Sequence, residues 1–183
     1  MRRRAFILAL GSVGLAGLSG TLGTDDGYIR PDGDPVPTPF DCEQAGFEPH
    51  HPGYDNNHLH WGDTEDASLR INGVEFAYGD TAEITLQTNS RGVDEKWNFE
   101  LLTDEGWRDV RGTTDDEARL KYELPKKTST AEWAITLTEE GIIRAGGNQD
   151  VLEICPTLVS GRYRFVYWGL SGESVAVSFD MTV

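Results

Sequence analysis

The chain has 183 residues, with 31 Asp and Glu against 16 Lys and Arg, and a formal net charge of −15. This length suits one domain with additional segments. Five Trp, six Tyr and seven Phe supply enough apolar surface for one sizeable core, which excludes global disorder. The acidity excludes non-specific nucleic-acid binding, because phosphates require Lys and Arg. Two Cys exclude a disulfide-dense scaffold.

Residues 1–23 have the order of an export signal. Three arginines precede an apolar stretch from residue 5 to about residue 18, and a polar segment follows. Arg3, Arg4 and Phe6 resemble the twin-arginine export motif. The alternative is an uncleaved membrane anchor, but the apolar stretch is shorter than the roughly 20 residues that a spanning helix needs. We therefore expect a processed signal and an extracytoplasmic protein, secreted or at the cell surface, with membrane contact only through an uncleaved signal.

Residues 24–66 predict an extended, solvated spacer. Six of the eight prolines lie in it, and eleven acidic residues face a single basic one, Arg30. Neither the period of a strand nor that of a helix runs through the segment. Proline favours extended backbone and like charges repel, so the segment is expected to act as a linker, with a part near Cys42 tied to the domain.

All four histidines lie within eleven residues of this spacer: His50, His51, His58 and His60. Imidazoles are ligands for zinc, copper and nickel, which gives one candidate function as a metal-binding or metal-handling protein. The spacing matches no closed zinc pattern, so polar loop residues on a tether are the other interpretation. We expect no resident cofactor.

Residues 67–183 alternate apolar and polar side chains with the period of a half-buried strand. The clearest examples predict strands over residues 81–89, 97–101, 133–137, 163–167 and 175–183. Turn residues rich in Gly and Asp separate them, and a short helical turn is expected near residues 138–143. About seven strands in about 117 residues predict an all-β fold, an immunoglobulin-like Greek-key β-sandwich.

One local pattern adds to this. Leu158-x-x-Gly161-x-Tyr163 directly precedes the strand over 163–167. It predicts a tyrosine corner, in which the ring packs inside and the hydroxyl bonds to nearby backbone. The alternative is an ordinary core aromatic.

Several of these segments together resemble a prokaryotic immunoglobulin-like domain family, found in secreted proteins and lipoproteins of haloarchaea and in exported bacterial proteins. The matching segments are Tyr78-Gly79-Asp80, Thr88-Asn89, Gly106-Trp107, Trp133 and Cys155-Pro156-x-Leu158-x-x-Gly161-Arg162-Tyr163-Arg164-Phe165. The resemblance covers residues 67–183 and implies an extracytoplasmic β-sandwich. It supplies no catalytic residues.

Cys42 and Cys155 are 113 positions apart in the sequence. In an oxidising compartment an even pair predicts a disulfide, which would fix the end of the spacer to the domain. The alternative is two unpaired, partly buried thiols.

The sequence indicates no enzyme. Nucleophile-elbow, zinc-protease and phosphate-loop motifs are absent from it, and residues 67–183 contain no histidine to act as a general base. Trp61, Trp107 and Trp168 are candidate surface aromatics for stacking on sugars or contacting a partner. We therefore expect a non-enzymatic surface or secreted domain that is structural or binds an unknown protein or glycan.

The charge balance generates a first prediction. Without the three N-terminal arginines, 31 acidic residues face 13 basic ones, a net charge of −18. Sparse Lys and abundant carboxylates are typical of adaptation to high salt, where mutual repulsion is screened within about 3 Å at about 1 M. We expect a lower melting temperature in dilute buffer than in molar NaCl, measured by circular dichroism. A melting temperature that does not change with NaCl would contradict this.

Overall fold

The computed structural model describes residues 27–183 except residues 90, 93, 116, 118, 123–125 and 128. The predicted export signal, with Arg3, Arg4 and Phe6, lies outside the described residues.

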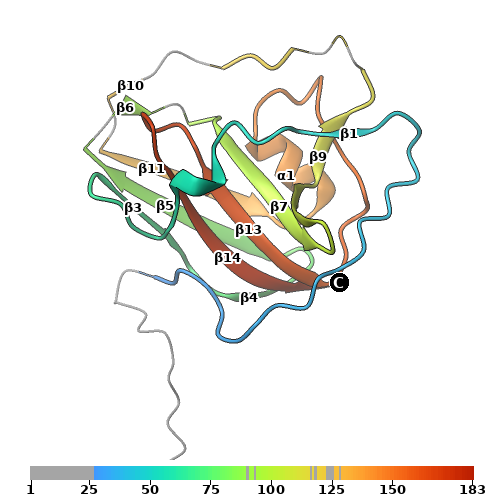
Figure 1. Ribbon diagram of the computed structural model, residues 1–183, viewed down its shortest axis with the longest axis horizontal. Helices are drawn as coiled ribbons and strands as arrows, with labels where there is room; N and C mark the ends of the chain where they lie inside the picture. The colour runs from blue at the N-terminus through green and yellow to red at the C-terminus, as the bar shows by residue number, and fades with distance from the viewer. Residues whose placement is uncertain are drawn as a thin grey trace, which may run out of the picture.

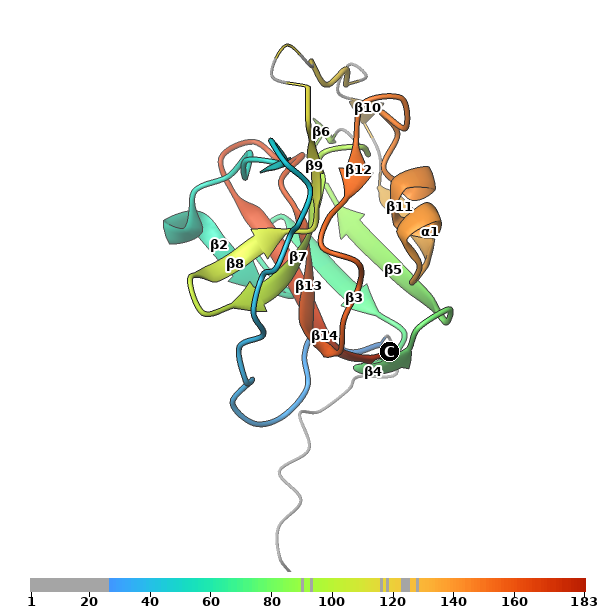
Figure 2. The ribbon, with the colours of Figure 1, turned by 90° about the vertical axis from the view of Figure 1, so that its right-hand side faces the viewer.

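The fold is an all-β sandwich of two main sheets (Figures 1 and 2). The smaller sheet has the order β11-β5-β3, and its strands are β3 (Ala67–Ile71), β5 (Thr81–Thr88) and β11 (Thr130–Thr136). The larger sheet has the order β2-β14-β13-β7-β8, and its strands are β2 (Leu59–Trp61), β7 (Trp97–Thr103), β8 (Gly106–Asp109), β13 (Gly161–Tyr167) and β14 (Ser174–Thr182). A short strand, β4 (Glu75–Ala77), also pairs with β14.

Shorter elements decorate the sandwich. A three-stranded sheet has the order β1-β9-β12, with β1 (Glu48–Pro49), β9 (Arg111–Thr113) and β12 (Glu153–Ile154). A two-stranded sheet joins β6 (Arg91–Gly92) to β10 (Lys126–Lys127). The helical elements are a 3₁₀ turn, η1 (Asn56–His58), and one α-helix, α1 (Glu139–Ala145). The described residues include no helix long and apolar enough to cross a membrane.

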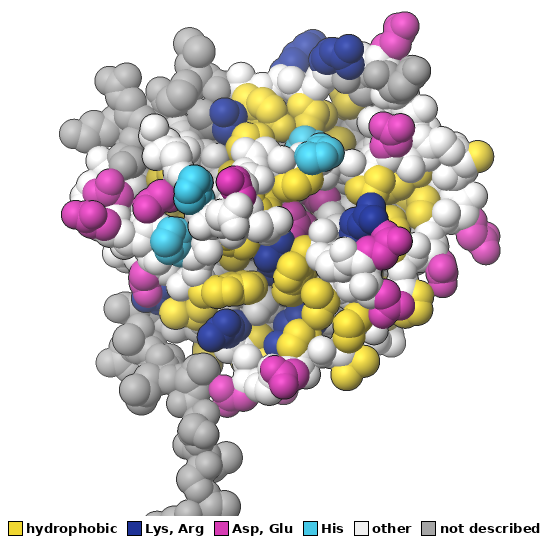
Figure 3. Space-filling model, viewed as in Figure 1, with side chains coloured by type: hydrophobic (Ala, Val, Ile, Leu, Met, Phe, Trp, Pro, Cys, Tyr) yellow, Lys and Arg dark blue, Asp and Glu magenta, His cyan; other side chains and the backbone are white. Residues whose placement is uncertain are grey.

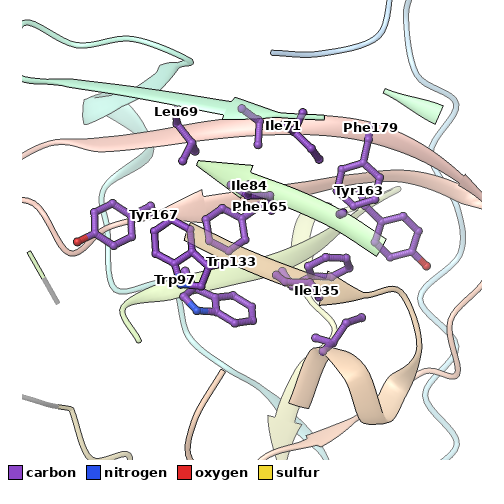
Figure 4. Packing of buried hydrophobic residues seen from close by; sticks show 14 of the residues in the cluster. Leu69, Ile71, Ile84, Trp97, Trp133, Ile135, Tyr163, Phe165, Tyr167 and Phe179 are labelled. Atoms are coloured by element: carbon purple, nitrogen blue, oxygen red, sulfur yellow. The ribbon is translucent and has the colours of Figure 1, made fainter. Parts of the chain in front are cut away.

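The core lies between the two sheets. Strands β5 and β11 alternate buried and more exposed residues along their length, so each presents one apolar face inward. Aromatic side chains of the larger sheet meet them there (Figure 4). The Trp133 ring centroid on β11 lies 5.1 Å from that of Phe165 and 5.4 Å from that of Tyr167, both on β13. Packing of these rings therefore holds the two layers together.

The larger sheet does not have the solvated outer face that the alternation predicts. Outward-facing Asn98, Glu100 and Arg164 are as deeply buried as core residues. The reason is that residues 27–62 lie against this face, as the blue and cyan chain in Figures 1 and 2 shows. One-sided strands are found in the smaller sheet, whereas β7, β13 and β14 are covered on both sides.

The expectation of a solvated linker is therefore wrong for residues 27–66. The Thr38 amide donates to Leu102 O at 3.0 Å, and the Ser178 amide donates to Ile29 O at 2.8 Å. Strand β1 pairs with β9, and β2 runs parallel to β14. Composition and periodicity did not predict this attachment, because the segment has no strand or helix period of its own. The backbone hydrogen bonds that attach it are made to strands from other parts of the chain.

Helix α1 occupies the place of the expected helical turn. The Thr138 side chain accepts a hydrogen bond from the Gly141 amide at 3.0 Å and so caps its N-terminus. Glu139 reaches from the first turn to accept a bond from the Leu158 amide at 3.1 Å. The helix is thereby tied to the loop that leads into β13.

That loop has the geometry of a tyrosine corner. The fully buried Tyr163 donates its hydroxyl to Val159 O at 2.8 Å and accepts from the Val159 amide at 3.1 Å. Burial raises the pKa of Tyr163 to about 12. A Cβ on Gly161 would lie 2.7 Å from Thr38 Oγ1, so the glycine allows residues 27–62 to approach closely.

The predicted disulfide between Cys42 and Cys155 is confirmed, with the two Cα atoms 5.4 Å apart. Cys155 is buried, and its amide donates to Val110 O at 2.9 Å. Such a structural disulfide is characteristic of proteins that fold in an oxidising compartment. It links residues 27–62 covalently to the segment between β12 and β13.

Replacing both cysteines tests this link. Because the disulfide closes a loop of 113 residues, we expect the double variant Cys42→Ser, Cys155→Ser to lose roughly 4–5 kcal/mol of unfolding free energy. Urea unfolding followed by tryptophan fluorescence measures the change. Equal stability of the variant and the wild type would contradict the expected contribution.

Candidate functional site

The outer face of the larger sheet, here called the front face, carries three of the five tryptophans. Trp61, Trp107 and Trp168 lie there and are partly buried, whereas Trp97 and Trp133 belong to the core. Figure 3 shows hydrophobic side chains with Lys and Arg between them across the middle of this face, and many acidic side chains toward its rim. The candidate site is therefore sought here.

A buried ion pair forms the centre of the front face. Arg164 on β13 and Glu100 on β7 are about 4% and 3% exposed, and Arg164 Nη2 lies 2.7 Å from Glu100 Oε2. Tyr54 donates its hydroxyl to Glu100 Oε1 at 2.8 Å and accepts from Arg164 Nη2 at 2.7 Å. Asn98 donates to the same carboxylate at 3.0 Å. With these bonds the carboxylate is well satisfied, as a buried charge must be.

A second buried pair lies where β8 leads into β9. Arg111 Nη2 is 2.8 Å from Asp109 Oδ2, and both side chains are almost fully buried. The guanidinium also lies 4.0 Å from the Trp97 ring centroid and donates to the Trp97 carbonyl. Burial raises the pKa of Asp109, while the charge of Arg111 opposes that rise. The two side chains satisfy one another away from solvent, and the pair fixes the junction of β8 and β9.

Trp168 is packed and hydrogen-bonded. Its indole N–H donates to Asn98 Oδ1 at 2.8 Å, and the Tyr122 ring meets it edge-on at 5.6 Å. Lys96 Nζ lies 5.3 Å from its centroid. A Cβ on Gly53 would clash with the ring, so the chain at Gly53 lies directly on it. Little of Trp168 remains to contact a ligand.

Trp61 and Trp107 line an open pocket of about 470 Å³. The two ring centroids lie 6.4 Å apart, with the ring planes at 58°. The Arg164 guanidinium lies 4.4 Å from the Trp107 centroid, and the Arg30 guanidinium lies 5.6 Å from that of Trp61. The remaining lining residues come mainly from the N-terminal segment, with one each from β7, β13 and β14: Pro31, Asp32, Gly33, Asp34, Pro35, Leu102, Arg162 and Ser178.

The polar groups of the pocket are of two kinds. Arg162 is engaged, since its Nη2 donates to Asp180 at 2.9 Å and its Nη1 donates to Gly33 O at 3.4 Å. Within the described part of the chain, Arg30, Asp32 and Asp34 make no side-chain hydrogen bond or ion pair, nor do the indole N–H groups of Trp61 and Trp107. The pocket therefore offers unpaired donors and acceptors beside two aromatic rings.

The four histidines do not gather at one point. His50 is half-buried, with its ring centroid 6.5 Å from that of Trp168, and its amide donates to Arg111 O at 2.7 Å. Burial, with Arg111 second, lowers its pKa to about 4, so the ring is neutral near pH 7. The other three are exposed: His51, His58 and His60. In the described ranges no group of three or more His, Cys, Asp or Glu is placed to hold a metal ion, so the metal hypothesis gains no geometric support.

No family model, curated protein or solved structure matches the chain. The roles of the pocket residues are therefore argued from geometry and chemistry alone.

The sequence singled out Trp61 and Trp107 as surface aromatics, and the structure brings them together. It did not single out Arg30, Asp32 and Asp34 as lining residues. The available signal was Arg30, the only base in a strongly acidic segment. Arg162 was not predicted to line a pocket, because the alternation placed it on the solvated face of its strand.

His50 generates a prediction on pH. Its folded-state pKa of about 4 lies below the ordinary histidine pKa of 6.5. Between these values the unfolded chain binds a proton that the folded protein does not, so this group makes stability fall as pH drops from 6.5 to about 4. We expect His50→Gln to reduce the loss of stability across that window, measured by urea unfolding at several pH values.

The exposed His58 provides the matched control, since it is not among the groups that act on His50 and His58→Gln should leave the pH dependence unchanged. The same pH dependence in wild type and His50→Gln would contradict the assignment.

Proposed function

We propose that the protein is a non-enzymatic immunoglobulin-like domain, secreted or held at the cell surface in high salt, that binds a protein or glycan partner through the front face. The observation that carries the proposal is the pocket of about 470 Å³ at Trp61 and Trp107. Its volume falls within the range typical of ligand sites, as do those of other pockets in the described part of the chain, and its two indole rings distinguish it from them.

The strand arrangement supports the immunoglobulin-like assignment. Among the strands of the two main sheets, β5 is followed in the chain by β7, which lies in the opposite sheet, and β13 lies between β7 and β14. These are the crossovers expected of two Greek-key sheets packed face to face. The tyrosine corner at Tyr163 is a further feature of that class.

Two observations support an extracytoplasmic location. The Cys42–Cys155 disulfide suits an oxidising compartment, and residues 1–23 have the order of an export signal. Both features concern the compartment in which the chain folds, and neither depends on the identity of the partner.

A binding role, rather than a purely structural one, is favoured by the composition of the front face. Trp and Arg are the residues enriched at the energetic centres of interfaces. Trp61, Trp107 and Arg30 line one pocket, and the Arg164 guanidinium of the Arg164–Glu100 pair packs on the Trp107 ring.

Envelope binding by the full chain tests the proposal. We expect labelled wild-type protein to bind a cell-envelope fraction of its host in molar NaCl, and Trp61→Ala to bind at least about tenfold more weakly, as for a residue at the centre of an interface. The measurement is a sedimentation binding isotherm.

Tyr78→Ala is the matched control, because Tyr78 is an exposed aromatic beside α1 and outside the pocket. It should bind like the wild type. Absence of wild-type binding, or equal binding by Trp61→Ala, would contradict the proposal.

A further inference from the structure

We infer that the pocket at Trp61 and Trp107 takes a neutral sugar ring, the pyranose of an uncharged glycan. This inference rests on the proposed function and names the class of ligand for the same site. It is carried by the pairing of two indole rings with polar groups of both hydrogen-bonding types.

The shape of the pocket suits a sugar ring. The pocket has a volume of about 470 Å³ and is open to solvent. It can hold one or two rings of an oligosaccharide, while the rest of the oligosaccharide extends into solvent. The two indole planes stand at 58° to one another, so they form an angled wall. A pyranose has an apolar face of C–H groups that packs against such a ring, while its hydroxyls point sideways.

The polar groups match hydroxyls. A hydroxyl both donates and accepts, so a sugar needs donors and acceptors at the same site. Arg30 and the two indole N–H groups are donors, and Asp32 and Asp34 are acceptors. The described residues provide none of these groups with a hydrogen-bond partner, so each is available to a ligand.

The same groups disfavour other ligand classes. An anionic ligand would meet the carboxylates of Asp32 and Asp34, with only Arg30 as an unpaired cation in the described part of the pocket. An apolar peptide side chain would desolvate those carboxylates without giving them a bond, at a cost of about 1–3 kcal/mol or more for each. A neutral polyol avoids both penalties.

The site is also held in shape before a ligand arrives. Arg162 bonds Asp180 on one side and Gly33 O on the other, so the loop carrying Asp32 and Asp34 is fixed to β13. Pro31 and Pro35 flank that loop and restrict its backbone. Fixing the geometry in advance reduces the ordering cost of binding.

Trp168 provides an internal comparison. It lies on the same face, but its indole N–H is bonded to Asn98 and Gly53 lies on its ring. Trp61 and Trp107 differ from it in lining the pocket and in having no hydrogen bond to their indole N–H within the described residues.

The test uses the full chain and four neutral disaccharides as probes: maltose, cellobiose, mannobiose and chitobiose, with glucuronate as the anionic comparison. Binding is followed by indole fluorescence and saturation-transfer NMR. We expect at least one disaccharide to bind with a Kd of about 1 mM or tighter, and glucuronate not to bind. Since stacking and neutral hydrogen bonds are little screened, the affinity should persist in molar NaCl.

Two variants examine the assigned groups. Asp32→Ala combined with Asp34→Ala removes both acceptors, and Trp61→Ala removes a stacking ring; each should weaken disaccharide binding by about tenfold or more. Asp104→Ala is the matched control, because Asp104 is an exposed carboxylate in the β7–β8 turn, outside the pocket. It should leave the affinity unchanged. No binding of any disaccharide, preferential binding of glucuronate, or unaltered affinity in both pocket variants would overturn the inference.

Failure of the inference is distinguishable from failure of the proposed function. Periodate treatment of the envelope fraction destroys vicinal diols of sugars and leaves most protein surface intact. Envelope binding that depends on Trp61 but survives periodate would support a protein partner, which retains the proposed function and overturns the glycan. Loss of wild-type binding after periodate treatment would support both the proposed binding function and the glycan as its ligand.

Discussion

Coverage of the larger sheet by residues 27–62 is the constraint on which the rest of the structure depends. These residues bury the Arg164–Glu100 pair, supply Tyr54 to complete its hydrogen bonds, and contribute the pocket loop. An uncovered front face would leave Arg164 and Glu100 in water, where an ion pair contributes little. The Cys42–Cys155 disulfide keeps the covering segment in place by linking its middle to the body of the domain.

The buried charges and the open pocket are parts of one arrangement. Arg164 stacks on Trp107 while its polar atoms bind Glu100 and Tyr54, so the ring lies on a rigid base. Arg162 lies two residues before Arg164 on the same face of β13, and it donates hydrogen bonds to Asp180 and to the carbonyl of Gly33. Engaged arginines thus fix the walls, and the unpaired Arg30, Asp32 and Asp34 of the described chain remain for a ligand. The proposed site therefore requires no conformational change to bind its ligand.

The acidic surface and the glycan proposal are compatible in physical terms. Repulsion among carboxylates weakens as salt rises, whereas stacking on indole and hydrogen bonds to neutral hydroxyls depend little on ionic strength. A binding site built from these interactions would retain its affinity in the high salt that we propose for this protein. A site built on surface ion pairs would lose much of its affinity there.

Local patterns in the sequence determined the strands with the clearest alternation (β5, β7, β11, β13 and β14), the inward residues of β5 and β11, the Tyr163 motif and the pairing of Cys42 with Cys155. Each of these follows from alternation, turn chemistry or simple counting, which act over a few residues or need only two partners. Tertiary structure alone decided that residues 27–66 cover a sheet, that Glu100 and Arg164 become buried, and that Asp32 comes to the same pocket as Trp107. The physical reason is that burial of a face depends on what packs against it, and the covering segment has no periodic signal of its own.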